Sequence, residues 1–252
     1  MKLLKFSLPS LLFILATGLL SANETIFNGK DLTGWSAEDM SYWSVQDGAI
    51  VGTKGDQKIP GNQFLWYDKK VSDFKLTLKV KQVPFAANAG IQFRSIREPN
   101  GHAIGYQADI GKGWWGALYH EHGRKILAKN KDTAGKHLNP EKWNKYEILA
   151  VGHRIWLAIN GQITVALRDP IGELEGQISL QVHGGMPQKV IYRDLTLERN
   201  PQVKMLGMNE AALDKILKLA PKGFIKPKGN NSYPFVKKKF QRSMIIWKKL
   251  FF

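Results

Sequence analysis

Apolar and polar residues alternate along much of the chain between about residues 42 and 199. In the run from Phe74 to Lys81, Phe, Leu and Val occupy every second position, and Lys or Thr fills the positions between them. Because successive side chains of a β-strand point to opposite faces, this run predicts a strand with one face in a core and the other in water.

Turn signals separate several runs of this kind. Residues 154–168, RIWLAINGQITVALR, join two β-rich runs through Asn160-Gly161, a pair that favours a type I′ hairpin turn. GQISLQVHGG and KVIYRDLTLER predict two further strands, and no helical period occurs before residue 200. Many short strands with turns between them are typical of a β-sandwich or barrel. We therefore predict an all-β domain over residues 24–199.

The pattern changes after residue 200. NEAALDKILKLA predicts a short helix with Asn209 as its N-cap and with Leu213, Ile216 and Leu217 on one face. The rest of the chain carries nine basic residues and no acidic one, so residues 200–252 are expected to form a short helix and a basic tail. Two interpretations of the tail remain open. It is a disordered, solvated segment, or, because apolar residues interleave with its lysines, it contacts an anionic membrane surface.

Residues 1–22, MKLLKFSLPSLLFILATGLLSA, predict an export signal. Lys2 and Lys5 form a basic start, an apolar stretch follows, and Ser21-Ala22 gives a small-residue end. The apolar stretch has about fifteen residues, whereas a membrane-spanning helix needs roughly 20. We therefore expect a cleaved signal peptide and an exported protein, periplasmic or extracellular.

The net charge of +16 is concentrated outside the predicted domain. The first 22 residues contribute +2, and residues 201–252 contribute +10 from 12 Lys and Arg against two acidic residues, which leaves +4 for residues 23–200. A nucleic-acid-binding domain would carry its basic patch on the folded part, so we expect no nucleic-acid partner. The chain has no cysteine, which excludes disulfides and a cysteine nucleophile.

A second alternation brings polar residues of unusual types together. In residues 105–124, GYQADIGKGWWGALYHEHGR, Gln107 and Asp109 share a face of one strand, and Tyr119 and Glu121 share a face of the next. If Asp109 lies opposite Ala117, all four face the same way and the apolar residues between them face the core. The same rule applied to NAGIQFRS and GQISLQVH extends this face to a set of eight residues: Gln92, Arg94, Gln107, Asp109, Tyr119, Glu121, Gln181 and His183.

The residue types on this face indicate a carbohydrate ligand. Each sugar hydroxyl both donates and accepts hydrogen bonds, and the C–H face of a sugar ring stacks on aromatic rings such as those of Trp114 and Trp115. An ordinary solvated face uses Lys and Thr, as residues 74–81 do. Any single position is equally compatible with a solvated strand position, whereas the set favours a binding site.

Two other motifs are less informative. GKGWWG (111–116) fits a dinucleotide-binding pattern, but no helix begins after it, so a pyrophosphate site is disfavoured. His120 and His122 have a spacing compatible with a metal. We expect these two histidines to point away from Glu121 and to form an edge or loop pair.

Within residues 24–199 the chain contains, in order, FNGKDLTGW, YWSVQDGAIVG, NAGIQFRS, the stretch 105–124, WNKYEILAVGHRIWLAINGQ, and ISLQVHGG followed by VIYRDLTLE. This ordered series resembles the 3-keto-disaccharide hydrolase domain family. The resemblance implies a concanavalin-like jelly-roll sandwich of two antiparallel sheets with a concave sugar-binding face. It also implies cleavage of glycosides that are oxidised at C3.

The resemblance places the family's polar stretch on residues of the same face. Ala89 departs from the serine that many members have there, so no hydroxyl function is assigned to that position. The basic tail is no part of the family pattern. The positions carried over from the family are Arg94, Gln107, Asp109, Tyr119, Glu121, Arg124 and His183.

A ketone at C3 acidifies the C2–H bond, so a base can remove this proton while an acid protonates the leaving C1 oxygen. Asp109 and Glu121 are the expected acid and base, His183 is a second base candidate, and Arg94 is expected to hold the enolate oxygen. Direct hydrolysis by the two carboxylates remains an alternative. No cofactor is expected, with a divalent ion on Asp109, Glu121 and His183 as the minority option. The expected substrate-binding residues are Arg94, Gln107, Trp114, Trp115, Tyr119, Arg124 and Gln181.

The sequence therefore predicts an exported carbohydrate-active enzyme that cleaves 3-keto-glycosides by hydrolysis or by elimination. The alternative is a non-catalytic, lectin-like carbohydrate-binding module, because the same sandwich serves lectins. Two carboxylates on one face favour the enzyme, since a binding module can recognise sugar with amides and aromatic rings alone.

Overall fold

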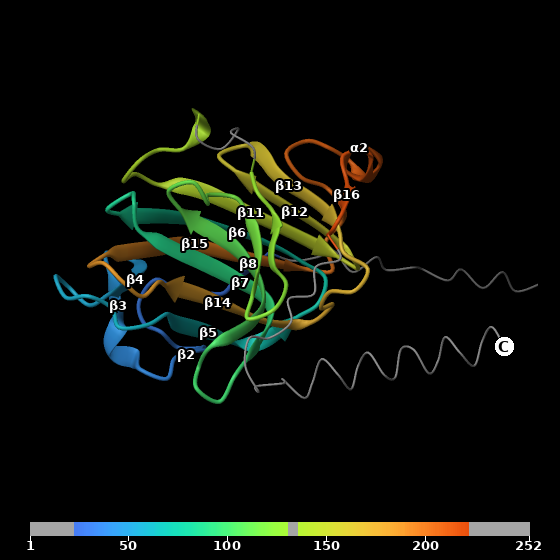
Figure 1. Cartoon of the computed structure of the whole chain (residues 1–252). Helices are drawn as coiled ribbons and strands as arrows, with labels where there is room; N and C mark the ends of the chain where they lie inside the picture. The colour runs from blue at the N-terminus through green and yellow to red at the C-terminus, as the bar shows by residue number, and fades with distance from the viewer. Residues whose placement is uncertain (1–22, 131–135, 222–252) are drawn as a thin grey trace, which may run out of the picture.

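The computed structural model of the chain describes residues 23–130 and 136–221. In this part of the chain two β-sheets pack face to face, and the two layers of strands are visible in Figure 1. The nine-stranded sheet runs, in order, through β16 (Lys218–Leu219), β13 (Gln162–Arg168), β12 (Arg154–Ile159), β11 (Asn144–Val151), β6 (Phe74–Val83), β15 (Lys189–Arg199), β4 (Ala49–Thr53) and β3 (Trp43–Gln46), with β1 (Asn23–Thr25) paired to β15. The short helix η1 (Met40–Tyr42) precedes β3.

The second sheet has seven strands and carries the predicted polar face. Its order is β10 (Lys125–Ala128), β9 (Leu118–Glu121), β8 (Ala103–Gly111), β7 (Asn88–Arg97), β14 (Gly176–Val182), β5 (Gln63–Val71) and β2 (Trp35–Ser36). Every strand pair in the two sheets is antiparallel except β13 with β16. The prediction of a jelly-roll sandwich of two antiparallel sheets is confirmed.

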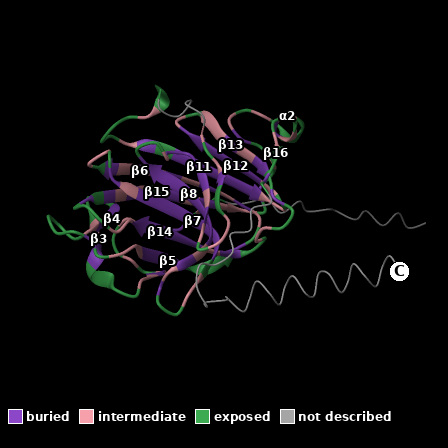
Figure 2. Ribbon diagram, viewed as in Figure 1, coloured by how far each residue is buried: buried purple, intermediate pink, exposed green. Residues whose placement is uncertain are grey.

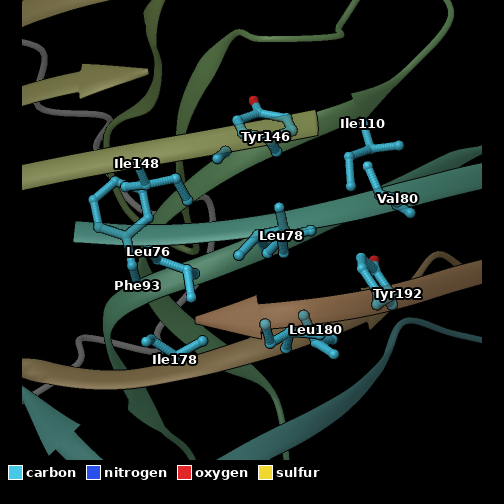
Figure 3. Packing of buried hydrophobic residues seen from close by; sticks show 14 of the residues in the cluster. Leu76, Leu78, Val80, Phe93, Ile110, Tyr146, Ile148, Ile178, Leu180 and Tyr192 are labelled. Carbon is cyan, nitrogen blue, oxygen red and sulfur yellow. The ribbon is translucent and has the colours of Figure 1, made fainter. Parts of the chain in front are cut away.

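The core lies between the two sheets, where the apolar positions of each strand meet. Leu76, Leu78 and Val80 of β6 alternate inward and face Ile178 and Leu180 of β14, as Figure 3 shows from close by. Figure 2 shows the same arrangement as buried strands at the centre and exposed connections at the rim. Full burial of each such side chain contributes roughly 1.5–3 kcal/mol to folding, so this alternation determines which face of each strand turns inward.

The predicted hairpin at residues 154–168 is confirmed. β12 and β13 pair through it, with Ile159 opposite Gln162. Asn160 and Gly161 have φ angles of 48° and 84°, the positive values that a type I′ turn requires at both central residues.

The folded unit extends beyond residue 199. Asn209 caps α2 (Glu210–Lys215) by accepting a hydrogen bond from the amide of Ala212 at 3.0 Å, as predicted. Leu213 is 0 % exposed and packs with Met205 against Trp156 on the outer face of the nine-stranded sheet. Ile216, expected on the same face, is 39 % exposed because the helix ends before it.

The predicted export signal (1–22) and the basic tail after residue 221 lie outside the described residues, so both interpretations stay predictions. Among the residues that the structure does describe, none of the helices has the length and apolar character that crossing a bilayer requires.

We expect Leu213→Ala to destabilise the whole protein. The substitution removes a fully buried side chain that covers Trp156, and such a change lowers the free energy of unfolding by roughly 2–5 kcal/mol. Ile216→Ala, three residues further along the same segment and exposed, is the matched control and should change it by less than about 0.5 kcal/mol. Urea unfolding followed by tryptophan fluorescence measures both variants. Equal stabilities would show that residues 200–221 are not part of the cooperative unit.

Candidate active site

The register of the β8–β9 hairpin agrees with the prediction. Gln107 lies opposite Tyr119, and the amide of Asp109 donates to the carbonyl of Ala117 at 3.0 Å. Asp109 and Gln107 therefore face away from the core on the same side as Tyr119 and Glu121. We call the outer side of the seven-stranded sheet around these residues the polar face.

The polar face continues across β7 and β14. Gln92 lies between Gln107 on β8 and Ser179 on β14, while Gly90 lies between Asp109 and Gln181. The structure thus brings together six of the predicted residues: Gln92, Gln107, Asp109, Tyr119, Glu121 and Gln181.

A chain of hydrogen bonds crosses three strands of this face and ends at Asp109. The hydroxyl of Ser179 donates to Oε1 of Gln92 at 3.0 Å, Nε2 of Gln92 donates to Oε1 of Gln107, and Nε2 of Gln107 donates to Oδ1 of Asp109. All four side chains are buried. A Cβ at Gly90 would lie 2.6 Å from Cδ of Gln107, so the glycine leaves the space in which that amide lies over β7.

Asp109 is only 3 % exposed, and this burial raises its pKa to about 7. The hydrogen bond from Gln107 lowers the pKa, and the charge of Glu121 raises it. Asp109 therefore exchanges a proton near neutral pH, which is the property that a general acid or base needs.

Glu121 is the second carboxyl on this face. Burial raises its pKa, and the charges of four histidines, led by His122 and His183, oppose the rise. His122 lies with Nε2 at 3.8 Å from Oε1 of Glu121 and Nδ1 at 3.0 Å from Glu98. Its ring also stacks on His102, with the ring centroids 5.3 Å apart.

The expectation that His122 points away from Glu121 is therefore wrong, whereas His120 does point inward and lies 3.0 Å from Glu173. β9 ends at Glu121, and His122 has a φ of 47°, so the alternation of a strand no longer governs its direction. The run HEHGR, with its terminal Gly-Arg, carries the turn signal that could have indicated this end of the strand.

Three polar atoms of two side chains on the polar face have no hydrogen-bond partner among the described residues. They are Nε2 and Oε1 of Gln181 and Oδ1 of Asn88, and all three are buried. Buried polar atoms are almost always paired in folded proteins, so these missing partners set this part of the polar face apart from the paired side chains beside it. His183, half-buried at the end of β14, contacts the carbonyl of Gly184 through Nδ1 at 2.6 Å, which leaves Nε2 for a ligand.

Arg94 does not lie on the polar face, contrary to the prediction. A β-bulge follows Phe93, and Arg94 has a φ of 47° that turns its side chain out of the alternation. The guanidinium is 1 % exposed and bonds the carbonyls of Ser72 and Gly152 at 2.8 and 2.6 Å and Asp73 at 3.0 Å. Arg94 therefore joins the ends of the two sheets and cannot hold a substrate oxygen.

Arg124 and Trp115 also lie away from the polar face. Arg124 forms a bidentate ion pair with buried Asp169, in which Nη1 donates to Oδ1 at 2.9 Å. This ion pair connects the turn after β9 to the loop after β13. Trp115 belongs to the core and stacks on Phe85 with a centroid distance of 5.8 Å. Trp114 is half-buried in the same loop under the ammonium group of Lys129, so its binding role stays a prediction.

In residues 23–130 and 136–221 no three His, Asp or Glu side chains are arranged as a metal-ligand set. Asp109, Glu121 and His183 are thus not arranged as a metal-ligand set in this structure, and the divalent ion stays a prediction.

The family of the chain follows from a family model that matches residues 22–198 and describes a 3-keto-alpha-glucoside-1,2-lyase-like domain. The match covers well over half of the chain and contains every strand that builds the polar face. The chain belongs to this family. The family is the one that the ordered sequence motifs resemble, and membership makes the protein a carbohydrate-active domain with a jelly-roll fold.

Solved structures share the fold of this 3-keto-alpha-glucoside-1,2-lyase-like domain at low sequence identity. A "putative glycosyl hydrolase" from Parabacteroides distasonis is 19 % identical with a TM-score of 0.56, and the alignment covers 71 % of this chain and 94 % of that one. The carbohydrate-binding module CBM66 from Bacillus subtilis is 18 % identical with a TM-score of 0.52, covering 66 % and 95 %. At these identities the likeness shows the fold alone. No curated protein matches the sequence.

The pKa of Asp109 predicts how Asp109→Asn changes stability with pH. The raised pKa means that the folded protein binds the proton more tightly than the unfolded chain, whose value is near 3.8. The stabilising effect of the protonated carboxyl is present below pH 4 and is lost as the pH rises through about 7.

Asp109→Asn should therefore melt close to wild type near pH 4 and gain stability over it up to about pH 7, by at most about 1.4 kcal/mol per pH unit. Thermal unfolding monitored by circular dichroism across this range measures the difference. If the stability difference between Asp109→Asn and the wild type did not change with pH, the pKa of Asp109 would be the same in the folded and unfolded protein.

Proposed function

We propose that the protein is an enzyme that cleaves the glycosidic bond of 3-keto-glycosides. The observation that carries the proposal is the pair Asp109 and Glu121 on one sheet face, in which burial raises the pKa of Asp109 to about 7. A carboxyl with this pKa is protonated in about half of the molecules at pH 7 and can act as general acid, and an ionised carboxyl on the same face can act as base. Family membership supports the substrate class.

In the proposed reaction Glu121 takes the C2 proton of the oxidised ring, which the C3 ketone acidifies. The electron pair of the C2–H bond passes through the enolate into a C1=C2 double bond as the C1–O bond breaks, and Asp109 gives its proton to the departing glycosidic oxygen. The products are an unsaturated 3-keto sugar and a free alcohol. Addition of water across the double bond then yields the hydrolysed sugar, so lyase and hydrolase outcomes share the first step.

The enolate oxygen needs a hydrogen-bond donor, and Tyr119 and Gln181 are the candidates now that Arg94 is excluded. Burial, with the charges of Glu121 and Asp109, raises the pKa of Tyr119, so its hydroxyl keeps its proton and can donate. Nε2 of Gln181 is a buried donor without a partner among the described residues. Fixed donors at a developing oxyanion are a large source of rate acceleration.

The proposal includes export, which rests on residues 1–22. N-terminal sequencing of the mature protein from the periplasm or medium tests it. A start near Asn23 supports export, and an intact Met1 on protein retained in the cytosol contradicts it.

Asp109→Asn and Glu121→Gln should each fold and bind the sugar but turn over a 3-keto-glycoside roughly 10²- to 10⁴-fold more slowly, because each removes a proton-transfer group while retaining its shape. Release of the free alcohol is the measurement. Glu198→Gln, on the nine-stranded sheet, is the matched control and should keep wild-type turnover. Wild-type protein that binds the sugar without releasing alcohol would favour the carbohydrate-binding module instead.

The pH profile should report Asp109 as the acid. Since Asp109 must carry its proton, kcat/KM should fall as the pH rises above about 7. Asp109→Asn should abolish this alkaline decline in its residual activity. If the decline persists in this variant, the titration of another group causes it.

A further inference from the structure

The hydrogen-bond chain that ends at Asp109 has a direction. A primary amide has one donor end and one acceptor end, so once Gln107 donates to Asp109, its Oε1 must accept from Gln92, and Oε1 of Gln92 must accept from Ser179. The order of donors in the structure is therefore Ser179, Gln92, Gln107, with Asp109 as the final acceptor.

The same side chains could form the chain in reverse. Asp109 would then carry its proton on Oδ1 and donate it to Oε1 of Gln107, and both amides would turn so that Gln92 donates to Oγ of Ser179. A proton on Oδ1 would be engaged by Gln107 and unavailable to a substrate. The direction of the chain therefore decides which carboxyl oxygen carries the reactive proton.

The two directions differ in the number of hydrogen bonds that they form, and the difference arises at Ser179. Its side chain is buried, and within the described part of the chain its hydroxyl donates only to Gln92. In the observed direction every member has its partner, whereas reversal leaves the hydroxyl hydrogen of Ser179 buried without an acceptor. An unpaired buried donor is destabilising, so the observed direction is favoured.

We propose that Ser179 is a positioning residue that, through Gln92 and Gln107, keeps Oδ1 of Asp109 as a hydrogen-bond acceptor and reserves Oδ2 for the proton that reaches the substrate. The role of that proton rests on the proposed function, whereas the direction of the hydrogen bonds from Ser179 to Asp109 does not.

The test is the ionisation of Asp109 in Ser179→Ala, measured from its ¹³C-labelled carboxyl by NMR. Without the hydroxyl, either direction leaves one end of the Gln92 amide unpaired, so the advantage of the observed direction disappears. The protonated form of Asp109 then becomes more stable relative to the ionised form, so the acid dissociation constant of Asp109 should fall roughly tenfold. The titratable groups that interact with Asp109 are Tyr119 and Glu121 of β9 and Tyr146 of β11, and His183 interacts with Glu121; all are unchanged in this variant.

Ser95→Ala is the matched control. Ser95 is a buried serine on β7 whose hydroxyl donates to the backbone carbonyls of Phe93 and Tyr106 at 3.1 and 3.2 Å, outside the chain. Its loss should leave the ionisation of Asp109 unchanged. Ser179→Thr, which keeps the hydroxyl, should restore the wild-type value. If Ser179→Ala does not fold, Gln92→Met breaks the chain at its middle and should give the same tenfold fall.

A folded Ser179→Ala or Gln92→Met variant with the wild-type ionisation of Asp109 would overturn the proposal, because a purely structural serine would change the melting temperature alone. A shifted ionisation in a protein that turns over no 3-keto-glycoside would support the direction of the chain and refute the proposed reaction. If the variant is active, the pH at which kcat/KM declines should rise together with the midpoint of the NMR titration.

Discussion

The hydrogen bonds between the backbone of Asp109 and residues 116–117 fix the register of β8 against β9, and the polar face depends on this register. Because side chains alternate along a strand, a slip of one residue would turn Asp109 toward the core and an apolar residue outward. Burial of Ala108 opposite Leu118 makes such a slip unfavourable. The apolar core thus determines where the two carboxyls point, although it never contacts a ligand.

The polar face is organised at the expense of stability. Buried polar groups are destabilising unless they are paired, and the hydrogen bonds from Ser179 to Asp109 pair a hydroxyl, two amides and a carboxyl. Gln181 remains unpaired among the described residues. Strain and incomplete pairing of this kind are common at functional sites, where a ligand completes the interactions.

Alternation along regular strands was enough to predict the fold and the central part of the site. It placed Gln107, Asp109, Tyr119, Glu121 and Gln181 correctly, because each lies in a strand that pairs without interruption at that point. It failed where a strand is irregular. Arg94 occupies a bulge, and the stretch FRSI carried a signal, since strict alternation would place Ile96 on the polar face with Arg94.

Other residues could not be placed by alternation because their positions depend on contacts distant in sequence. Arg124 is held by Asp169, and Trp115 by Phe85. His122 lies beyond the end of β9, and Leu213 packs on a strand more than fifty residues earlier. Ser179 lies two residues before Gln181 and therefore on the same side of β14, but only the observed hydrogen bonds show that it is linked to Asp109.

The central claim is that the polar face binds the oxidised sugar with its reacting atoms between Asp109 and Glu121. A crystal structure of Glu121→Gln soaked with a 3-keto-disaccharide tests this claim most directly. We expect the glycosidic oxygen within hydrogen-bond distance of Asp109, roughly 3 Å, and C2 of the oxidised ring beside position 121. A sugar bound on the nine-stranded sheet, or bound here with these two atoms directed away from both positions, would contradict it.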